Sequence, residues 1–479
     1  MIDDAKKRAV ILAVSVTQFT MPFMFSAVGV ALPAIGHEFG ATGIDLSLVE
    51  SIYIGGIAAL LLPFGRYSDM HGRQPVFRMG VLLYAIFTLL LGFTQDINTV
   101  IFLRLAQGIS GALAIATNMA LLTESVPLRE RGKAMGLAVA AVYIGLSAGP
   151  YIGGLVTTHM GWRWLFFLGT IPLGISYIVA YRNLKEKFCS SDEKFDYSGS
   201  MMVIFSVAAL VFGGTNLSAG WPGVALLLSG LVGFAIFIFM QGRAKFPLVE
   251  LTLFKERKDF SDAAFVQFIS YAGTFGIVFL FSLYLQSVKA MTPHETGVVL
   301  VVQPIVQAVL SPLCGRLADR FYPRIIAMSG MIVCTAGSIM GACVGAETSL
   351  AYLYMMFVVL GVGFALFSAP NMIILMGSVP PSRFGFASAI TGALRTIGMV
   401  ASMVIIAIFL SMFMGDVIVS PESAVPYMRV MHYSLVTLSG LCVIGVVISM
   451  RQVYRRFYGK SEVAKQDFCV QSAVSNEEN

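Results

Sequence analysis

The chain has 479 residues, of which 57% are hydrophobic and only 12% charged, and its mean hydropathy is +0.81. Soluble globular domains typically carry about 25% charged and about 45–50% apolar residues. The chain therefore lacks the polar surface that a soluble enzyme, a nucleic-acid-binding protein or a disordered scaffold needs. The composition predicts an all-α polytopic membrane protein, and the 47 glycines fit helices that pack closely in lipid.

Fourteen apolar stretches are long enough to cross a bilayer, because a spanning helix needs about 20 mostly apolar residues. The even number places both termini on one side of the membrane. In chain order, we expect the spans at residues 9–34, 46–65, 77–94, 99–123, 134–157, 163–182, 197–217, 222–242, 261–286, 296–315, 324–344, 350–378, 385–413 and 429–450.

The positive charges indicate the orientation of the chain. Of the 32 Lys and Arg residues, 27 fall on the side of the N-terminus and three on the opposite side, while Arg104 and Arg395 lie inside spans. Cytoplasmic loops of membrane proteins are enriched in Lys and Arg. We therefore expect both termini to be cytoplasmic in a multi-pass protein of the cell membrane. The net charge of +6 then needs no nucleic-acid partner to explain it.

Motifs for catalysis, metal binding or nucleotide hydrolysis are missing from the sequence. The six cysteines form no CxxC pair, and the five histidines have no ligand spacing. There is no GxxxxGK[ST] phosphate loop, so ATP-driven pumping is not expected. We predict that the protein is not an enzyme and holds neither a metal nor a cofactor.

A weak internal repeat divides the chain into two halves. GRYSDMHGRQP (residues 65–75) follows the second span, and GRLADRFYPR (residues 315–324) follows the tenth. Transporters built from repeats bind their substrate between the halves. We expect an N-terminal six-helix bundle at 1–183, a linker with two extra spans at 184–260, a C-terminal six-helix bundle at 261–451 and a cytoplasmic tail at 452–479.

The first of these loops resembles the GxxxDxxGR signature of the major facilitator superfamily, through Gly65, Asp69, Gly72 and Arg73. The resemblance implies that the loop latches the two halves in one state of the transport cycle. Glu124 is the further partner expected for it, and Asp319 is the counterpart of Asp69 in the repeat. The alternative is that these are ordinary solvated loop charges.

Two further strings carry the same resemblance. RLAQGISGA in the fourth span matches the RxxqG pattern, which implies a role for Arg104 in proton coupling; the alternative is an arginine that reaches the nearby headgroups. The fifth span contains GxxxGPxxGG, which resembles the signature of drug:proton antiporters. Its members are Gly145, Gly149, Pro150, Gly153 and Gly154.

Fourteen spans point to the 14-helix branch of those antiporters, and VALPAIGHEF (residues 30–39), PLVELTLF (residues 247–254) and LRTIGMVAS (residues 394–402) resemble stretches of it. The resemblance implies a major facilitator fold of two six-helix bundles with two inserted central helices. Two positions depart from the branch. Met24 stands where the first helix usually carries an Asp, and Leu48 stands where the second usually has a Trp.

The missing Asp directs attention to the remaining charges inside spans, which are costly there and usually face a bundle interior. We hypothesise that Glu50 takes up a proton during the cycle and pairs with Arg104 when charged. The alternative is a Glu at a helix start, facing the headgroups. Arg395, the third residue predicted for proton coupling, lies near the bilayer midplane and should have a partner or a wet cavity, unless backbone carbonyls satisfy it.

Uncharged polar side chains inside spans could line a substrate cavity, although hydrogen bonding between helices is the better explanation for any single one. The candidates are Gln18, Asn118, Gln303 and Asn371.

The sequence thus predicts a secondary active transporter that exports amphipathic or drug-like small molecules in exchange for protons by alternating access. Its expected partners are a small-molecule substrate, protons and the lipid bilayer, with no nucleic acid and no obligate protein partner. One alternative is an importer or uniporter of a small metabolite without proton coupling. Another is a non-transporting membrane sensor or assembly protein on the same fold.

Overall fold

The computed structural model describes residues 4–127, 130–184, 195–379, 384–415, 417–419 and 421–477. These residues are almost entirely helical, apart from an isolated β-bridge between Thr42 and Ile418. The elements are α1 (Asp4–Phe39), α2 (Gly43–His71), α3 (Arg73–Leu91), α4 (Ile97–Ser125), α5 (Arg131–His159), α6 (Arg163–Asn183), α7 (Tyr197–Thr215), η2 (Leu217–Ala219), α8 (Trp221–Gln241), α9 (Leu251–Glu256), α10 (Lys258–Thr274), α11 (Ile277–Leu283), η3 (Tyr284–Val288), α12 (Pro293–Leu300), α13 (Val302–Arg320), α14 (Pro323–Ala342), α15 (Leu350–Gly377), α16 (Phe384–Phe413), η5 (Pro421–Ser423) and α17 (Ala424–Glu477).

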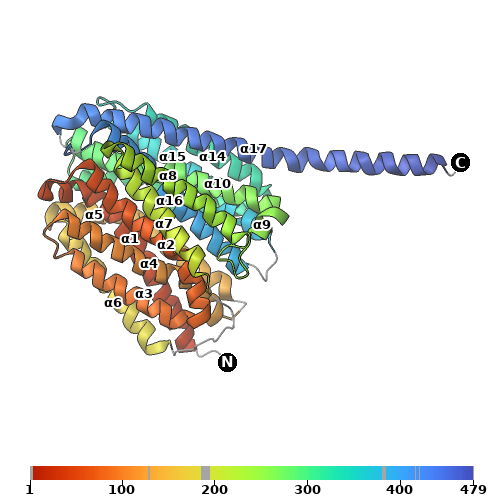
Figure 1. Ribbon diagram of the computed structural model, residues 1–479, viewed down its shortest axis with the longest axis horizontal. Helices are drawn as coiled ribbons and strands as arrows, with labels where there is room; N and C mark the ends of the chain where they lie inside the picture. Colours follow the sequence, from red (N-terminus) through yellow and green to blue (C-terminus); the bar gives the residue numbers. More distant parts are fainter. Residues whose placement is uncertain are drawn as a thin grey trace.

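Fourteen stretches of the described helices are long and apolar enough to cross a membrane, which confirms the predicted number of spans and the all-α class. Most helices begin or end a few residues beyond the predicted limits. The largest difference is α17, which continues past the predicted end at residue 450 to Glu477 and extends away from the bundle in Figure 1.

Two predicted spans are interrupted. The ninth divides into α10, α11 and the π-turn η3, and the tenth divides into α12 and α13. At the first break, the N–H of Gly276 donates to Ser402 Oγ of α16 (2.9 Å). At the second break, Pro304 has no N–H to offer the preceding turn, so the helix is interrupted at Val301. A hydropathy pattern records neither kind of interruption.

The helices form two groups with an inserted pair beside them. In Figure 1, α1–α6 (red to yellow) form one group and α10–α17 (green to blue) the other. The inserted helix α7 packs against both α2 and α16. A Cβ added at Gly55 of α2 would lie 3.4 Å from Val211 of α7, and one added at Gly214 of α7 would lie 3.0 Å from Val404 of α16.

The two halves repeat one packing device. In the first half, a Cβ added at Gly80 of α3 would lie 2.6 Å from the backbone N of Ala114 in α4. In the second half, a Cβ added at Gly330 of α14 would lie 2.5 Å from the backbone N of Phe367 in α15. Because apolar attraction does not distinguish lipid from protein, such close backbone approach is a main source of helix association in membranes.

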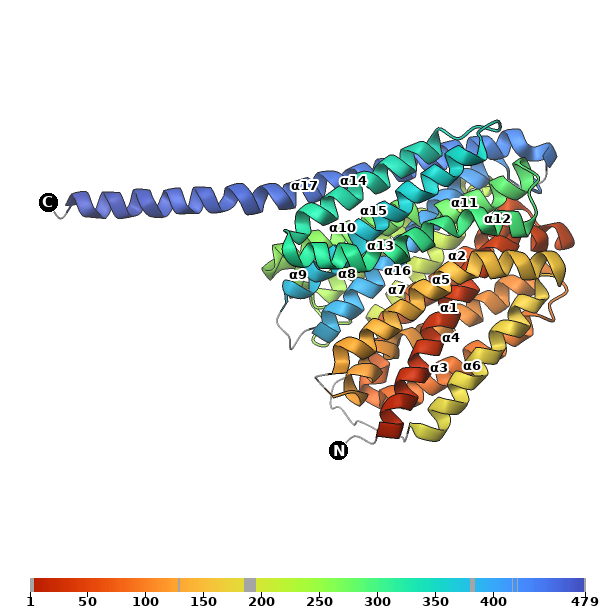
Figure 2. The ribbon, with the colours of Figure 1, turned by 180° about the vertical axis from the view of Figure 1, so that it is seen from behind.

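The halves meet at one face of the molecule. We call the face that carries the N-terminus the terminus face and the opposite one the far face. Towards the far face, Ser282 Oγ donates to the carbonyl of Gly29 (2.7 Å), and Gln286 Nε2 donates to the carbonyl of Val30 (2.9 Å). Figure 2 shows the two groups of helices together at the far face and diverging towards the terminus face.

The close glycine contacts predict a graded effect on stability. Gly330→Ala should lower the free energy of unfolding by about 1–3 kcal/mol, because the added methyl meets backbone that cannot move aside. Gly440→Ala on α17, where a Cβ has no neighbour within 4 Å, is the matched control. Melting temperatures of the purified variants in detergent measure the difference, and equal values would contradict the predicted packing.

Candidate functional site

A buried ion pair lies inside the first half. Arg104 Nη2 of α4 is 3.5 Å from Glu50 Oε2 of α2, and the two side chains are 0% and 3% exposed. Each residue lies seven positions from the far-face end of its helix, which corresponds to roughly 10 Å of helix rise. The pair is therefore inside the membrane-spanning part of the bundle and away from both faces.

The two side chains meet because α2 and α4 touch through their backbones. A Cβ added at Gly108 of α4 would collide with the carbonyl oxygen of Tyr53 in α2, and one added at Gly56 of α2 would lie 3.3 Å from the carbonyl of Leu105. Any larger residue at Gly108 would force the helices apart. This glycine, four residues after Arg104, brings the guanidinium within reach of Glu50.

Other groups also hold the guanidinium. Arg104 Nη1 donates to Gln107 Oε1 (2.7 Å), and its Nε donates to the carbonyl of Val49 (3.4 Å). The ring of Tyr53 lies 4.1 Å from the guanidinium carbon, within cation–π distance. Gln107 is fixed in turn, because its Nε2 donates to Thr88 Oγ1 (2.8 Å).

Glu50 is held much less firmly. Among the described residues, neither of its carboxylate oxygens accepts a hydrogen bond. Its contact with Arg104 is an attraction between charges at 3.5 Å without hydrogen-bond geometry. Burial in a region of low dielectric disfavours a charged carboxylate that has so few donors around it. If Glu50 lost its charge, Arg104 would keep its other three partners.

Three residues of this network were not singled out from the sequence. Tyr53 and Tyr84 share a hydrogen bond between their hydroxyls (3.1 Å), and Thr88 donates to the carbonyl of Tyr84 (2.6 Å) while accepting from Gln107. Tyr84 and Thr88 lie four apart on one face of α3. That spacing is too common to carry a prediction without the position of Arg104.

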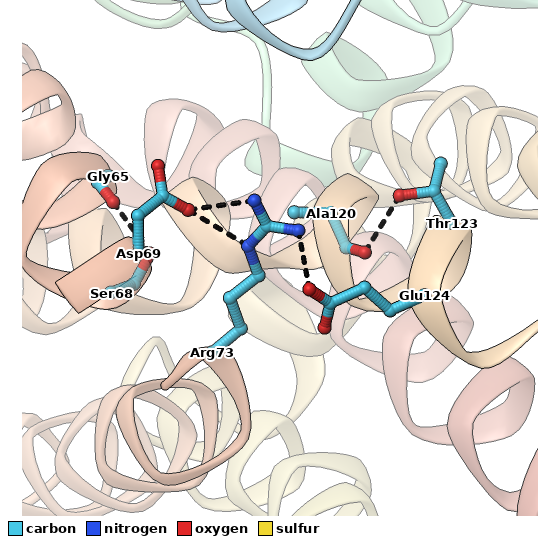
Figure 3. A network of polar contacts seen from close by, with 7 residues as sticks. All are labelled: Gly65, Ser68, Asp69, Arg73, Ala120, Thr123 and Glu124. Carbon is cyan, nitrogen blue, oxygen red and sulfur yellow. Dashed lines mark hydrogen bonds and ion pairs between the residues drawn. The ribbon is translucent and has the colours of Figure 1, made fainter. Parts of the chain in front are cut away.

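A second charged cluster, shown in Figure 3, lies at the junction of α2 and α3, where the structure has helix in place of the predicted loop except at Gly72. Arg73 donates to Asp69 Oδ1 through Nε (3.0 Å) and Nη2 (2.8 Å), and through Nη1 to Glu124 Oε1 (2.8 Å). Gly72 turns the chain with φ = 97°, a conformation that favours glycine. One arginine thus joins the ends of α2, α3 and α4 at the terminus face.

The corresponding region of the second half is built differently. The side chain of Asp319 lies outside the described residues. Arg324, at the start of α14, binds Asp259 of α10 (2.6 Å), so in this half the arginine links two other helices. Gly65 and Gly315 have open space where a Cβ would stand, so close packing does not require a glycine at either position.

The glycines of α5 face two different neighbours. A Cβ added at Gly145, Gly149 or Gly153 would collide with α1 of the same half. A Cβ added at Gly154 would instead collide with the carbonyl oxygen of Pro293 in α12. The string that resembles an antiporter signature therefore contacts α1 of its own half and α12 of the other half. Pro150 lies inside α5, within the same string.

Arg395 lies apart from the Glu50–Arg104 pair. It is partly buried on α16 beside the hydroxyl of Tyr271 in α10, and Tyr143 of the first half lies near the same hydroxyl. Tyr143 is also 3.5 Å from Ser368 of the second half. Arg395 thus belongs to the region where the two halves face each other.

The polar residues predicted for a substrate cavity are mostly bonded to other helices. Asn118 donates to Gln18 (3.0 Å) in the first half, and Asn371 donates to Gln267 (2.7 Å) in the second. The two amide pairs join corresponding helices, so they belong to the internal repeat. Gln303 differs, because its Oε1 has no hydrogen-bond partner in the described structure.

Nothing in the part of the chain that the structure describes gathers three His, Cys, Asp or Glu side chains where they could hold a metal ion.

Comparison with known proteins places this geometry in a family. The family model of the Major Facilitator Superfamily matches residues 14–240 and 263–465. The chain belongs to the major facilitator superfamily. Members of this superfamily are transporters, so the chain is a secondary transporter, as predicted, and not an enzyme. The alternative of a non-transporting sensor or assembly protein is thereby set aside.

Several superfamily relatives have names that describe transport. The chain is 30% identical over 379 residues to the multidrug resistance protein Stp of Mycobacterium tuberculosis, covering 78% of this chain and 70% of Stp. It is 26% identical to the tetracenomycin C resistance and export protein of Streptomyces glaucescens, covering 85% of this chain and 76% of that protein. The riboflavin transporter RibZ of Clostridioides difficile is also 26% identical, over 82% of this chain and 86% of RibZ.

A solved structure shares the superfamily fold. A bacterial homologue of the human lysosomal transporter Spinster, in an inward-facing and unoccupied conformation, matches with a TM-score of 0.66 at 16% identity, covering 94% of this chain and 97% of the other. The predicted fold of two bundles is thus confirmed as that of a major facilitator.

Substitution of Arg73 in the cluster at the terminus face should reduce transport without reducing the amount of folded protein in the membrane. Arg73→Lys keeps the positive charge but lacks the planar guanidinium fork that donates to Asp69 through two nitrogens and to Glu124 through the third. Its pairs are 28–52% exposed, so stability should fall by only about 0.2–1 kcal/mol per pair. If the cluster holds one state of the cycle, transport should fall about 5- to 150-fold.

Arg455→Lys is the matched control, because Arg455 also forms a partly exposed pair, with Asp262 (3.3 Å). Efflux from whole cells, normalised to the amount of protein in the membrane, measures both variants. Equal efflux in the two would contradict a role for Arg73 in the transport cycle.

Proposed function

We propose that this transporter exports amphipathic or drug-like small molecules across the cell membrane in exchange for protons, with both termini in the cytoplasm. The names of Stp and of the tetracenomycin C protein support export. The distribution of Lys and Arg supports the orientation, because 27 of the 32 lie on the side of the termini. The proposed partners are the substrate, protons and the bilayer.

The observation that supports proton exchange is that the two residues of the buried pair, Arg104 and Glu50, differ in their number of bonding partners. Arg104 has Gln107, Val49 and Tyr53 besides Glu50, whereas Glu50 has only the charge of Arg104. A proton arriving at Glu50 would neutralise it, and Arg104 would keep its contacts with Gln107, Val49 and Tyr53. A proton leaving would restore the attraction across 3.5 Å. Glu50 is thus the proposed proton carrier and Arg104 the fixed counter-charge.

The remaining predicted sites take supporting roles in this proposal. Arg73 with Asp69 and Glu124 would stabilise one conformation at the terminus face. Arg395 stays a proposed proton-coupling residue and Gln303 a proposed substrate contact, and each has a polar atom without a hydrogen-bond partner in the described structure. The domain division at 1–183, 184–260 and 261–451 is the proposed division into moving parts.

A second candidate is transport of a metabolite without proton coupling. Met24, at the position where the antiporter branch usually has an Asp, is fully buried against Gly169 of α6 and brings no charge. RibZ, named a riboflavin transporter, shows that relatives at this level of similarity include a transporter named for a vitamin. The vesicle experiment below separates the two candidates.

Glu50→Gln should abolish proton-driven transport. In inside-out vesicles with an imposed acidic interior, the parent protein should accumulate ethidium, and a protonophore should stop the accumulation. Because Gln cannot exchange a proton, the variant should show no gradient-dependent uptake while still binding ethidium. Glu347→Gln, at an exposed loop position, is the matched control. Undiminished gradient-driven uptake with Glu50→Gln would refute the assignment of Glu50.

The proposed orientation has its own test in Cys343, the exposed one among the described free cysteines. It lies at the end of α14 on the far face, which should be outside the cell. After Cys189 and Cys469 are replaced by Ser, a membrane-impermeant maleimide added to intact cells should label the protein, and Cys343→Ser should remove the label. Labelling only after the cells are opened would reverse the orientation.

A further inference from the structure

We infer that Phe25 of α1 is a positioning residue that transmits the charge state of the Glu50–Arg104 pair to the second half of the molecule. The transmission runs through stacked rings that end at the interruption of the ninth span. The inference rests on the proposed proton exchange at Glu50 and adds the route by which the second half responds to it. None of the sequence motifs above contains Phe25.

Three rings form a continuous line from the buried arginine to the second half. The guanidinium carbon of Arg104 lies 4.1 Å from the ring centroid of Tyr53. Tyr53 is stacked on Phe25, with centroids 6.1 Å apart and planes inclined by 14°. Phe25 is stacked in turn on Phe275 of α10, with centroids 5.2 Å apart and planes inclined by 25°. Both separations are those of attractive aromatic pairs. We call these three residues the ring line.

Phe25 is the member of the ring line that joins the halves, because it contacts one ring in each of them. Tyr53 is 3% exposed and enclosed by the first half, whereas Phe25 and Phe275 are only partly buried. These two rings can therefore follow a movement of Tyr53 without displacing the core of either half.

The ring line ends where the ninth span is broken. Phe275 is the residue that caps α10, and the N–H of the next residue, Gly276, donates to Ser402 Oγ of α16 (2.9 Å). Ser402 stands seven residues after Arg395, which is about two turns of the same helix. A displacement of Phe275 would thus act on the broken backbone and, through Ser402, on the helix that carries Arg395.

The charge of Glu50 determines how the guanidinium is held against Tyr53. A charged Glu50 attracts Arg104 across 3.5 Å. When Glu50 is neutral, that attraction disappears, and the guanidinium is left with its hydrogen bonds and the face of Tyr53. A buried cation without a counter-charge is attracted more strongly to an aromatic face. Tyr53 is therefore a neighbour whose position depends on the charge, and Phe25 lies against it.

A second link between the halves also lies close to Glu50. Ser282 Oγ of the second half donates to the carbonyl of Gly29 (2.7 Å), and a Cβ added at Gly29 would lie 3.9 Å from Glu50 Oε1. This bond ends on helix backbone and includes no group that binds the guanidinium. Ser282→Ala removes this rival route and leaves the ring line intact, so the two routes can be tested separately.

The test places one fluorinated ring at the end of the ring line. p-Trifluoromethylphenylalanine replaces Phe275, and the fluorine NMR spectrum of the purified protein is recorded in detergent at alkaline pH. Glu50→Gln removes the negative charge and should shift the resonance. In a Phe25→Leu background this shift should be lost, because leucine is apolar but has no ring. It should persist with Ser282→Ala and with Phe19→Leu.

Phe19→Leu is the matched control for the loss of a ring from α1. Phe19 is stacked on Phe23 of the same helix, with centroids 5.7 Å apart, and it lies outside the ring line. Phe25→Tyr keeps the ring and should restore the response of the resonance. Melting temperatures of the two leucine variants show whether either protein is misfolded.

Vesicle transport gives a second readout, which a purely structural defect would not reproduce. Phe25→Leu should lower ethidium uptake driven by a pH gradient about fivefold or more. Exchange of radiolabelled for unlabelled ethidium without a gradient should be unchanged, because the ring line serves the response to the proton. Phe275→Leu added to Phe25→Leu should cause no further loss, since both substitutions interrupt the same line.

Several results would overturn the inference. These are a resonance that does not respond to Glu50→Gln, a response that survives Phe25→Leu, and a response lost equally with Phe19→Leu or Ser282→Ala. An exchange rate that falls as far as the gradient-driven uptake would also overturn it.

The NMR measurement needs neither substrate nor gradient, so it can fail separately from the proposed function. If Glu50→Gln left vesicle uptake intact while the resonance still responded through Phe25, proton coupling at Glu50 would fail and the ring line would stand. If Glu50→Gln abolished uptake while the response survived Phe25→Leu, the ring line would fail and the proposed function would stand.

Discussion

Close approach of helix backbones is the constraint on which this structure depends. In lipid, an apolar side chain gains little by leaving the bilayer for another helix, so helices associate where small residues let their backbones touch. Gly80 and Gly330 do this within the two halves, and Gly108 does it beneath the ion pair. The position of Arg104 beside Glu50 is therefore a consequence of backbone packing more than of the attraction between their charges.

In the ion pair, the positive charge of Arg104 is stabilised by several groups, whereas the negative charge of Glu50 is stabilised by Arg104 alone. Burying two charges is costly unless hydrogen bonds satisfy both of them, and here Arg104 makes two hydrogen bonds, through Nε and Nη1, while Glu50 makes none. Gln107 and Thr88 extend its support to α3, so three helices hold the guanidinium. Glu50 can change its charge with little rearrangement around it, while Met24 leaves the first helix without an acid at the usual position.

Much of the fold could be predicted from the sequence, because span number depends on composition over long windows. The pairing of Glu50 with Arg104 could also be anticipated, since the two opposite charges lie at similar depth in the second and fourth spans. The interruption of the ninth span could not, because it depends on Ser402, which is far away in the sequence. The sequence does not show whether Asn118 and Asn371 line a cavity or join helices. In the structure, each donates a hydrogen bond to a glutamine side chain on a neighbouring helix.

The inserted helix α7 makes the two sides of the molecule unequal. Where the halves meet, one lateral seam runs between α2 and α16 and is covered by α7, whereas the other is formed by α5 with α12 and α13. A hydrophobic molecule dissolved in the bilayer would meet an additional helix along the first seam and the bare junction of the halves along the second. Exchange of such molecules with the lipid would therefore be one-sided, with the insertion acting as a lateral barrier.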